Sequence, residues 1–134
     1  MLLQGSCHCR VVKFTVESVT PYPFMRCYCE VCRKTQGGGG FAINLGARSK
    51  TLRVSGRRSV RTYRARGESV SGGSAEDGCS YLRRNFCQIC GSALWCEDPR
   101  WPDLVHPFAS AIDTTLPKTP EAIHIMLNSV PDWV

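Results

Sequence analysis

The sequence predicts a mainly β domain, and three observations lead to this prediction. Apolar and polar residues alternate over several short stretches, as they do in strands that bury one face. Glycines and prolines separate these stretches, and long amphipathic helical patterns are almost absent. The composition, with 43% hydrophobic and 21% charged residues in a chain of 134, is that of a folded protein with one modest core. We therefore expect residues 1–134 to form a single domain.

The first strand is predicted over residues 11–19. Its apolar side chains from Val12 to Val16 recur at every second position, so they fall on one face. Pro21 and Pro23 are expected to end this strand, because proline breaks a regular ladder.

One or two helical turns are predicted over residues 30–36, ending at the four glycines that follow. Residues 67–78 are rich in glycine, serine and acidic side chains without periodicity, and they predict a surface loop. Residues 81–97 predict a strand, a cysteine-containing turn and a second strand. The remaining strand predictions cover residues 41–46, 51–56, 59–65, 106–113 and 122–130.

Nine cysteines are far more than an average chain carries, and the number is odd. The N-terminal "MLLQGSCHCR" lacks the basic and apolar regions of a secretory signal, so a disulfide framework is not expected. No apolar run approaches the roughly 18 residues needed to cross a bilayer. We therefore expect a soluble, cytoplasmic protein without a membrane partner, whose cysteines bind metal.

The net charge of +6 is unevenly distributed along the chain. Eight basic residues and no acidic residue lie between Arg48 and Arg66, and such a stripe can attract nucleic acid. These basic residues alternate with apolar ones, which is equally typical of a solvated strand face. Only Tyr63 supplies an aromatic ring among the arginines, so nucleic acid is not the favoured partner.

The cysteines form three groups along the chain. Thiolates two or three residues apart can bind one zinc ion from a tight turn, and Gly91 suits the turn in "FCQICG". A four-thiolate site could combine the last group with either of the other two, and spacing alone leaves both combinations open. The groups are Cys7 with Cys9, Cys27 with Cys29 and Cys32, and Cys87 with Cys90.

Four segments of the chain resemble one known family. The segments "GSCHC", "CYCEVCRK" and "FCQICGSAL" occur in the same order as in the glutathione-dependent formaldehyde-activating enzymes, a family also named for centromere protein V. The segment "HIMLNSVPDW" is similar to the closing H-I-x-x-x-S-x-P-x-W of that family. One departure is Arg10, which occupies a place that is commonly glycine.

The resemblance implies an Mss4-like fold, with small antiparallel sheets around a structural zinc. It also implies which cysteines share a metal ion. The structural zinc would be held by Cys7, Cys9, Cys87 and Cys90, and a second, catalytic zinc by Cys27, Cys29 and Cys32.

Three thiolates leave one coordination position of zinc open, which is the arrangement of catalytic sites. The resemblance then implies a carbon–sulfur lyase that joins glutathione or another thiol to formaldehyde or another carbonyl. Arg33 and Lys34 directly follow Cys32 and are candidates to offset the negative charge of the three thiolates or to bind a substrate carboxylate.

Two other functions fit the same fold. The alternative that we retain is a zinc-binding module that holds nucleic acid or protein without catalysis. A methionine sulfoxide reductase would need a reactive cysteine and a resolving partner, and the Cys-x-Cys-x-x-Cys pattern fits that need poorly. The sequence indicates no particular oligomeric state.

Overall fold

The structure is a computed structural model that describes residues 1–36, 38–66 and 73–134. The described part contains nine strands and one α-helix, α1, which covers Glu30–Gln36. No helix in these ranges is both long enough and apolar enough to cross a membrane. The strands are β1 Leu2–Ser6, β2 Lys13–Cys27, β3 Ala42–Arg48, β4 Arg53–Ser55, β5 Val60–Tyr63, β6 Arg83–Cys87, β7 Ala93–Glu97, β8 Leu104–Pro107 and β9 Ile123–Ile125.

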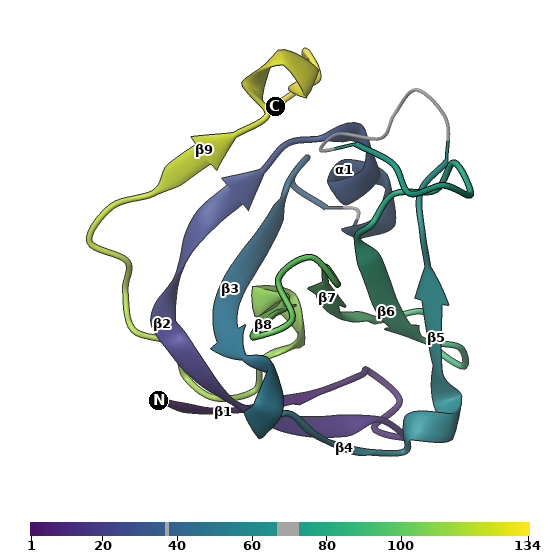
Figure 1. Ribbon diagram of the computed structural model, residues 1–134. Helices are drawn as coiled ribbons and strands as arrows, with labels where there is room; N and C mark the ends of the chain where they lie inside the picture. Colours follow the sequence, from purple (N-terminus) through teal and green to yellow (C-terminus); the bar gives the residue numbers. More distant parts are fainter. Residues whose placement is uncertain (37, 67–72) are drawn as a thin grey trace.

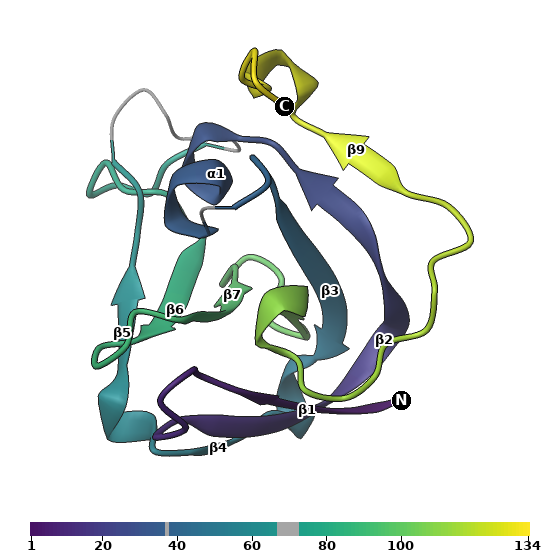
Figure 2. The same cartoon turned by 180° about the vertical axis from the view of Figure 1, so that it is seen from behind.

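The strands form one continuous sheet in the order β1-β2-β3-β8-β7-β6-β5, with β4 and β9 also paired to β2. Neighbouring strands are antiparallel except for β9, which runs parallel to β2. The sheet curls, so that β2 and β3 lie on one side of the molecule and β5 and β6 on the other (Figure 1). Seen from behind, α1 lies near one end of both halves, and β9 follows the outer edge of β2 (Figure 2).

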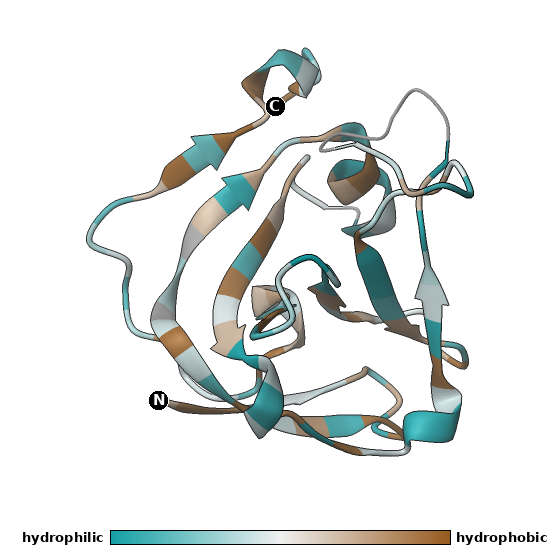
Figure 3. Ribbon diagram, in the orientation of Figure 1, coloured by the Kyte–Doolittle hydropathy of each residue, from teal (hydrophilic) through white to brown (hydrophobic). Residues whose placement is uncertain are grey.

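The core lies inside the curl, as the alternation in the sequence predicts. Val12, Phe14 and Val16 are all buried, and the Phe14 ring meets Trp95 edge-on with 5.2 Å between ring centroids. Hydrophobic and hydrophilic bands alternate along β2 and β3 in Figure 3. The mainly β, antiparallel fold with one short helix is therefore confirmed.

Several predicted boundaries differ from the structure. Of the strand predicted over residues 122–130, only Ile123–Ile125 form a strand, and Leu127–Ser129 form a 3-10 turn. Strand β2 does not end at the prolines but continues to Cys27, with irregular register between Thr20 and Met25. Strand β8 ends at Pro107, and Ala109–Ala111 form a 3-10 turn where a strand was expected. The edge strand β1 was not predicted.

The predicted loop at residues 67–78 falls partly outside the described residues, which resume at Gly73. In its described part, Ser74 bridges to Ser80 across a turn. The Arg64 guanidinium binds both carboxylate oxygens of Asp77, at 2.7 and 3.2 Å. This part of the segment is therefore tied to the end of β5.

One tight approach of two backbone segments gives a stability prediction. Gly56 has φ +79°, and a Cβ atom there would lie 2.0 Å from the carbonyl oxygen of Val11. Gly78 has the same φ with open space around it, so it is a matched control. We expect Gly78→Ala to lower the free energy of unfolding by about 1–2 kcal/mol, and Gly56→Ala by about 1–3 kcal/mol more. Urea unfolding of both variants measures the difference, and equal losses would contradict the clash.

Candidate functional site

The curled sheet places the cysteines at the ends of strands. Strand β1 ends one residue before Cys7, and β6 ends at Cys87. Strand β2 ends at Cys27, which pairs with Ala42 of β3 and with Ile125 of β9. The first cysteine group therefore joins β1 to β6, whereas the second lies where β2 leads into α1.

Four cysteines meet at the first of these places. The Sγ atoms of Cys7, Cys9, Cys87 and Cys90 all lie within 4.8 Å of one another. The Cys7–Cys9 and Cys9–Cys87 sulfur distances are 3.5 and 3.8 Å. Zinc bonded to four sulfurs at its usual distance would place them about 3.8 Å apart. The donor type and the spacing both fit a closed tetrahedral zinc site.

The turns that carry these cysteines need unusual backbone conformations. Gly91, after Cys90, has φ +77°, and its N–H donates to the carbonyl oxygen of Cys87 at 2.8 Å. Arg10, after Cys9, has φ +68°, a left-handed conformation that favours glycine.

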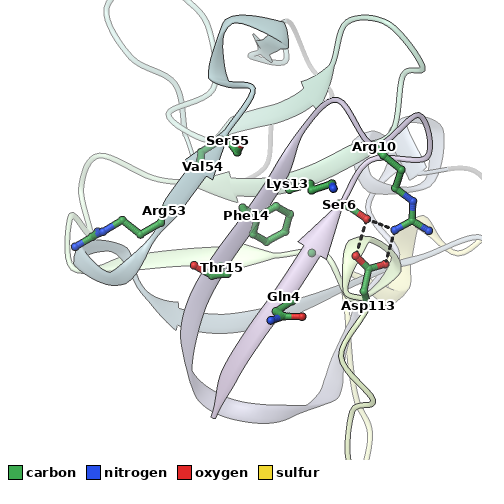
Figure 4. Close-up of a pocket in the computed structure, with 11 residues that line it drawn as sticks. Gln4, Ser6, Arg10, Lys13, Phe14, Thr15, Arg53, Val54, Ser55 and Asp113 are labelled. Atoms are coloured by element: carbon green, nitrogen blue, oxygen red, sulfur yellow. Dashed lines mark hydrogen bonds and ion pairs between the residues drawn. The ribbon is translucent and has the colours of Figure 1, made fainter.

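Side-chain contacts hold Arg10 in this conformation. Its Nη1 donates to the Ser6 hydroxyl at 2.7 Å and lies 3.5 Å from the Asp113 carboxylate. The Ser6 hydroxyl in turn donates to Asp113 at 2.5 Å, as Figure 4 shows. These contacts stabilise a strained turn beside the four-cysteine group.

The same three residues form one wall of a cavity of about 590 Å³ over β1, β2 and β4 (Figure 4). Lys13 and Arg53 add positive charge, but no cysteine lines this cavity. We therefore do not assign thiol chemistry to it, although it is large.

The second group consists of Cys27, Cys29 and Cys32. Their Sγ atoms also lie within 4.8 Å of one another, and the residues are 6%, 6% and 2% exposed. The Cys32 N–H donates to the Cys29 sulfur at 3.3 Å, so the first turn of α1 aims its backbone at the group. We call this group the triplet.

Among residues 1–36, 38–66 and 73–134, no further cysteine, histidine or carboxylate joins the triplet. Cys79 and Cys96 are buried thiols that belong to neither group. The structure thus groups the cysteines as the family resemblance implies, and the alternative that combines Cys29 and Cys32 with the last pair is wrong. Three thiol donors without a fourth fit a zinc ion that keeps one open position.

The thiols of the triplet share their protons unequally in the absence of metal. Hydrogen bonds from Cys27 and Cys32 hold the pKa of the Cys29 thiol far below its usual range. The contact with Cys29 raises the pKa of the Cys27 thiol, and contacts with Cys27 and Cys29 raise the pKa of the Cys32 thiol. In the other group, the Ser92 hydroxyl and the Cys9 N–H lower the pKa of Cys90 to about 5. Each group therefore holds one thiolate readily, as a metal ligand must.

A buried arginine contacts the triplet. Both terminal nitrogens of Arg84 lie 3.5 Å from the Cys32 sulfur, and the residue is 8% exposed. The sequence predicted that a cation should offset the thiolates but did not identify this one, which lies 52 positions from Cys32. The available signal was the sequence "RRNFC", where one of two adjacent arginines in a strand must face inward.

The two cations proposed from the sequence differ in their exposure to solvent and in their partners. Lys34 extends into solvent and pairs with Glu30 one helical turn away, at 3.5 Å. Arg33 is half-buried on α1, and its Nε has no hydrogen-bond partner within the described part of the protein. Their role toward a substrate carboxylate stays a prediction.

An apolar pocket of about 420 Å³ lies beside the triplet. Arg84 lines this pocket, as do Ala93 and Phe108, which also pack in the hydrophobic cluster around the three cysteines. A volume of this size and an apolar wall with few polar groups are typical of small-molecule sites. The remaining wall residues are Thr35, Gln36, Tyr63, Asn85, Phe86 and Gly91.

Comparison with known proteins agrees with the family resemblance seen in the sequence. The profile of the family described as glutathione-dependent formaldehyde-activating enzyme matches residues 2–129. A protein of Halomonas elongata, provisionally named glutathione-dependent formaldehyde-activating enzyme, is 54% identical over 134 residues, all of this chain and 80% of that protein. A crystal structure of a Rhodobacter sphaeroides protein has the same fold, with a TM-score of 0.63 and 23% identity over 87% of this chain and 99% of that one.

Proposed function

Because the chain belongs to the glutathione-dependent formaldehyde-activating enzyme family, we propose that it is a zinc-dependent carbon–sulfur lyase. The reaction would form or cleave a thiol–carbonyl adduct such as S-hydroxymethylglutathione. The observation that carries this proposal is the triplet, a buried set of three thiols to which the described residues add no fourth ligand.

The reaction itself needs no oxidant or reductant. In the forward direction a carbon–sulfur bond forms between the thiol sulfur and the carbonyl carbon, and the proton of the thiol ends on the carbonyl oxygen. In the reverse direction that bond breaks, and the thiol and the carbonyl compound are released. A zinc ion at the triplet would supply Lewis acidity, which lowers the pKa of a substrate thiol so that its thiolate forms near neutral pH.

The residues of the chain contribute position and environment. Cys27, Cys29 and Cys32 would hold the metal, and their burial limits the access of water. The apolar pocket beside Arg84 would receive the organic part of the adduct. Arg33 and Lys34 are proposed to meet a carboxylate of the thiol substrate at the outer end of α1.

Cys7, Cys9, Cys87 and Cys90 would hold the structural zinc. All nine cysteines lie in the described residues and are free thiols, which suits a reducing compartment. We therefore propose the cytoplasm as the place of this reaction.

The direct test of the function follows adduct exchange. Purified protein is mixed with formaldehyde labelled at carbon and with glutathione, and exchange between free and adduct carbon is measured by NMR. The proposal expects exchange faster than in a protein-free control at the same pH, and chelation should abolish the acceleration. An exchange rate equal to the protein-free control for glutathione and for simpler thiols would overturn it.

Metal content gives a second prediction. We expect two zinc ions per chain, of which the one at the triplet leaves first under mild chelation because it has fewer protein ligands. Elemental analysis during stepwise chelation measures both. A single zinc ion that remains after all three triplet cysteines are changed to serine would leave only the zinc-binding module.

A further inference from the structure

Arg84 is fixed in place by the sheet rather than by the triplet. It lies on β6 and pairs with Cys96 of β7 on one side and with Tyr63 of β5 on the other. Its guanidinium reaches the triplet from this position, with Nη1 and Nη2 each 3.5 Å from the Cys32 sulfur. A two-pronged contact of this kind fixes the direction as well as the distance of the sulfur.

The burial of Arg84 requires a negative partner. A guanidinium stays protonated in proteins, and a buried charge is costly unless an opposite charge lies against it. In the described part of the chain, the four ion pairs to carboxylates involve other cations, namely Arg10, Lys34, Arg64 and Arg100. The negative partner available to Arg84 is therefore the triplet as a whole, whose Cys32 sulfur it contacts.

The contact between Arg84 and Cys32 would balance the charge of a triplet that holds zinc. Three thiolates and one divalent zinc ion together carry one surplus negative charge, which a buried site tolerates poorly. The guanidinium offsets that charge and leaves the centre neutral. A substrate thiolate would then enter a neutral centre rather than one that already repels it.

We propose that Arg84 is the positioning residue of the triplet. It orients the Cys32 sulfur and offsets the surplus negative charge, so that three cysteines retain zinc and leave a position that admits an anionic thiol. The second half of this proposal rests on the proposed function, whereas the metal-retention half does not.

The test measures zinc retention without any substrate. Arg84→Met removes the charge, Arg84→Lys keeps the charge but loses the two-pronged contact, and Arg83→Met is the control on the adjacent, exposed side chain. Each protein is loaded with two zinc ions and titrated with a chromophoric chelator. Because partners of metal ligands are worth about 10–100-fold in affinity, we expect Arg84→Met to lose the more weakly held ion at about 10–100-fold lower chelator concentration.

Arg84→Lys should fall between the parent and Arg84→Met, and Arg83→Met should match the parent. A folded Arg84→Met protein that retains both ions as the parent does would overturn the proposal. If Arg84→Met fails to fold, the comparison of Arg84→Lys with Arg83→Lys decides, and parental retention in Arg84→Lys would overturn it. These outcomes are separate from the lyase proposal, because adduct exchange with unchanged zinc retention in Arg84→Met would contradict only the role of Arg84.

Discussion

Cys87→Ser is expected to leave the chain unfolded. Cys87 has no exposed surface, lies at the end of β6, and its sulfur is 3.8 Å from that of Cys9. A structural zinc site supplies about 10–16 kcal/mol of apparent binding free energy, whereas a whole domain is stable by only about 5–15 kcal/mol. Loss of one thiolate from the four-cysteine group should therefore remove the free energy that keeps the chain folded. Circular dichroism and amide NMR spectra at the purification temperature measure the result.

The control for this prediction is Cys96→Ala. Cys96 is also buried, and burial raises the pKa of its thiol to about 12, so it behaves as a neutral, apolar side chain. Its removal should leave a small cavity and a folded protein that melts at a moderately lower temperature. A Cys87→Ser protein that melts cooperatively near the parental temperature would contradict the assignment of Cys87 to a structural metal site.

Cys29→Ser is expected to abolish adduct exchange and leave the fold intact. Cys29 lies between β2 and α1, outside the four-cysteine group, so the structural zinc should remain. Removal of a group that hydrogen-bonds to a metal ligand typically costs about 10–100-fold in activity. Removal of a ligand should cost more, so we expect the exchange rate to fall by about 100-fold or more. The NMR exchange measurement described above gives the rate, and the melting temperature reports the fold. Exchange within a few-fold of the parent would show that the triplet is not the reacting site.

Cobalt substitution tests the same prediction by absorption spectroscopy, without measuring turnover. Thiolate ligands give cobalt a charge-transfer band, and addition of glutathione should change that band in the parent but not in Cys29→Ser. The matching control replaces three exposed arginines, Arg57 and Arg58 in a 3-10 turn and Arg61 on β5. If nucleic-acid binding is lost in that control and kept in Cys29→Ser, the binding-module alternative replaces the lyase.

The sequence was sufficient for features that depend on local pattern. Residues 30–36 form the predicted helix, and the buried face of β2 follows from alternation alone. The two prolines were misleading, because β2 has irregular pairing between Thr20 and Met25, where a missing N–H donor breaks no regular ladder. A proline is expected to end a strand only at a position where a backbone N–H would have to donate to the neighbouring strand.

The grouping of the cysteines was predictable from the sequence, but the surroundings of the candidate site were not. The order of the cysteine motifs identified both groups, since the resemblance carries information that spacing lacks. The contact between Arg84 and Cys32 depends on the register of β6 with β7 and on the curl of the sheet. Neither the register nor the curl can be predicted from a local segment. The sequence therefore pointed to Arg33 and Lys34, which follow Cys32 in the chain, rather than to Arg84, which lies next to it in space.

The two cysteine groups differ in when they can form during synthesis. The triplet lies within six consecutive positions and is complete once Cys32 has left the ribosome. The four-cysteine group must wait for Cys90, because its members Cys9 and Cys87 lie 78 positions apart. A metal ion that meets the growing chain would therefore encounter the complete triplet first, while β1 and β2 still lack β6. If the triplet binds zinc as we propose, newly made protein could hold an ion there before the four-cysteine group has formed.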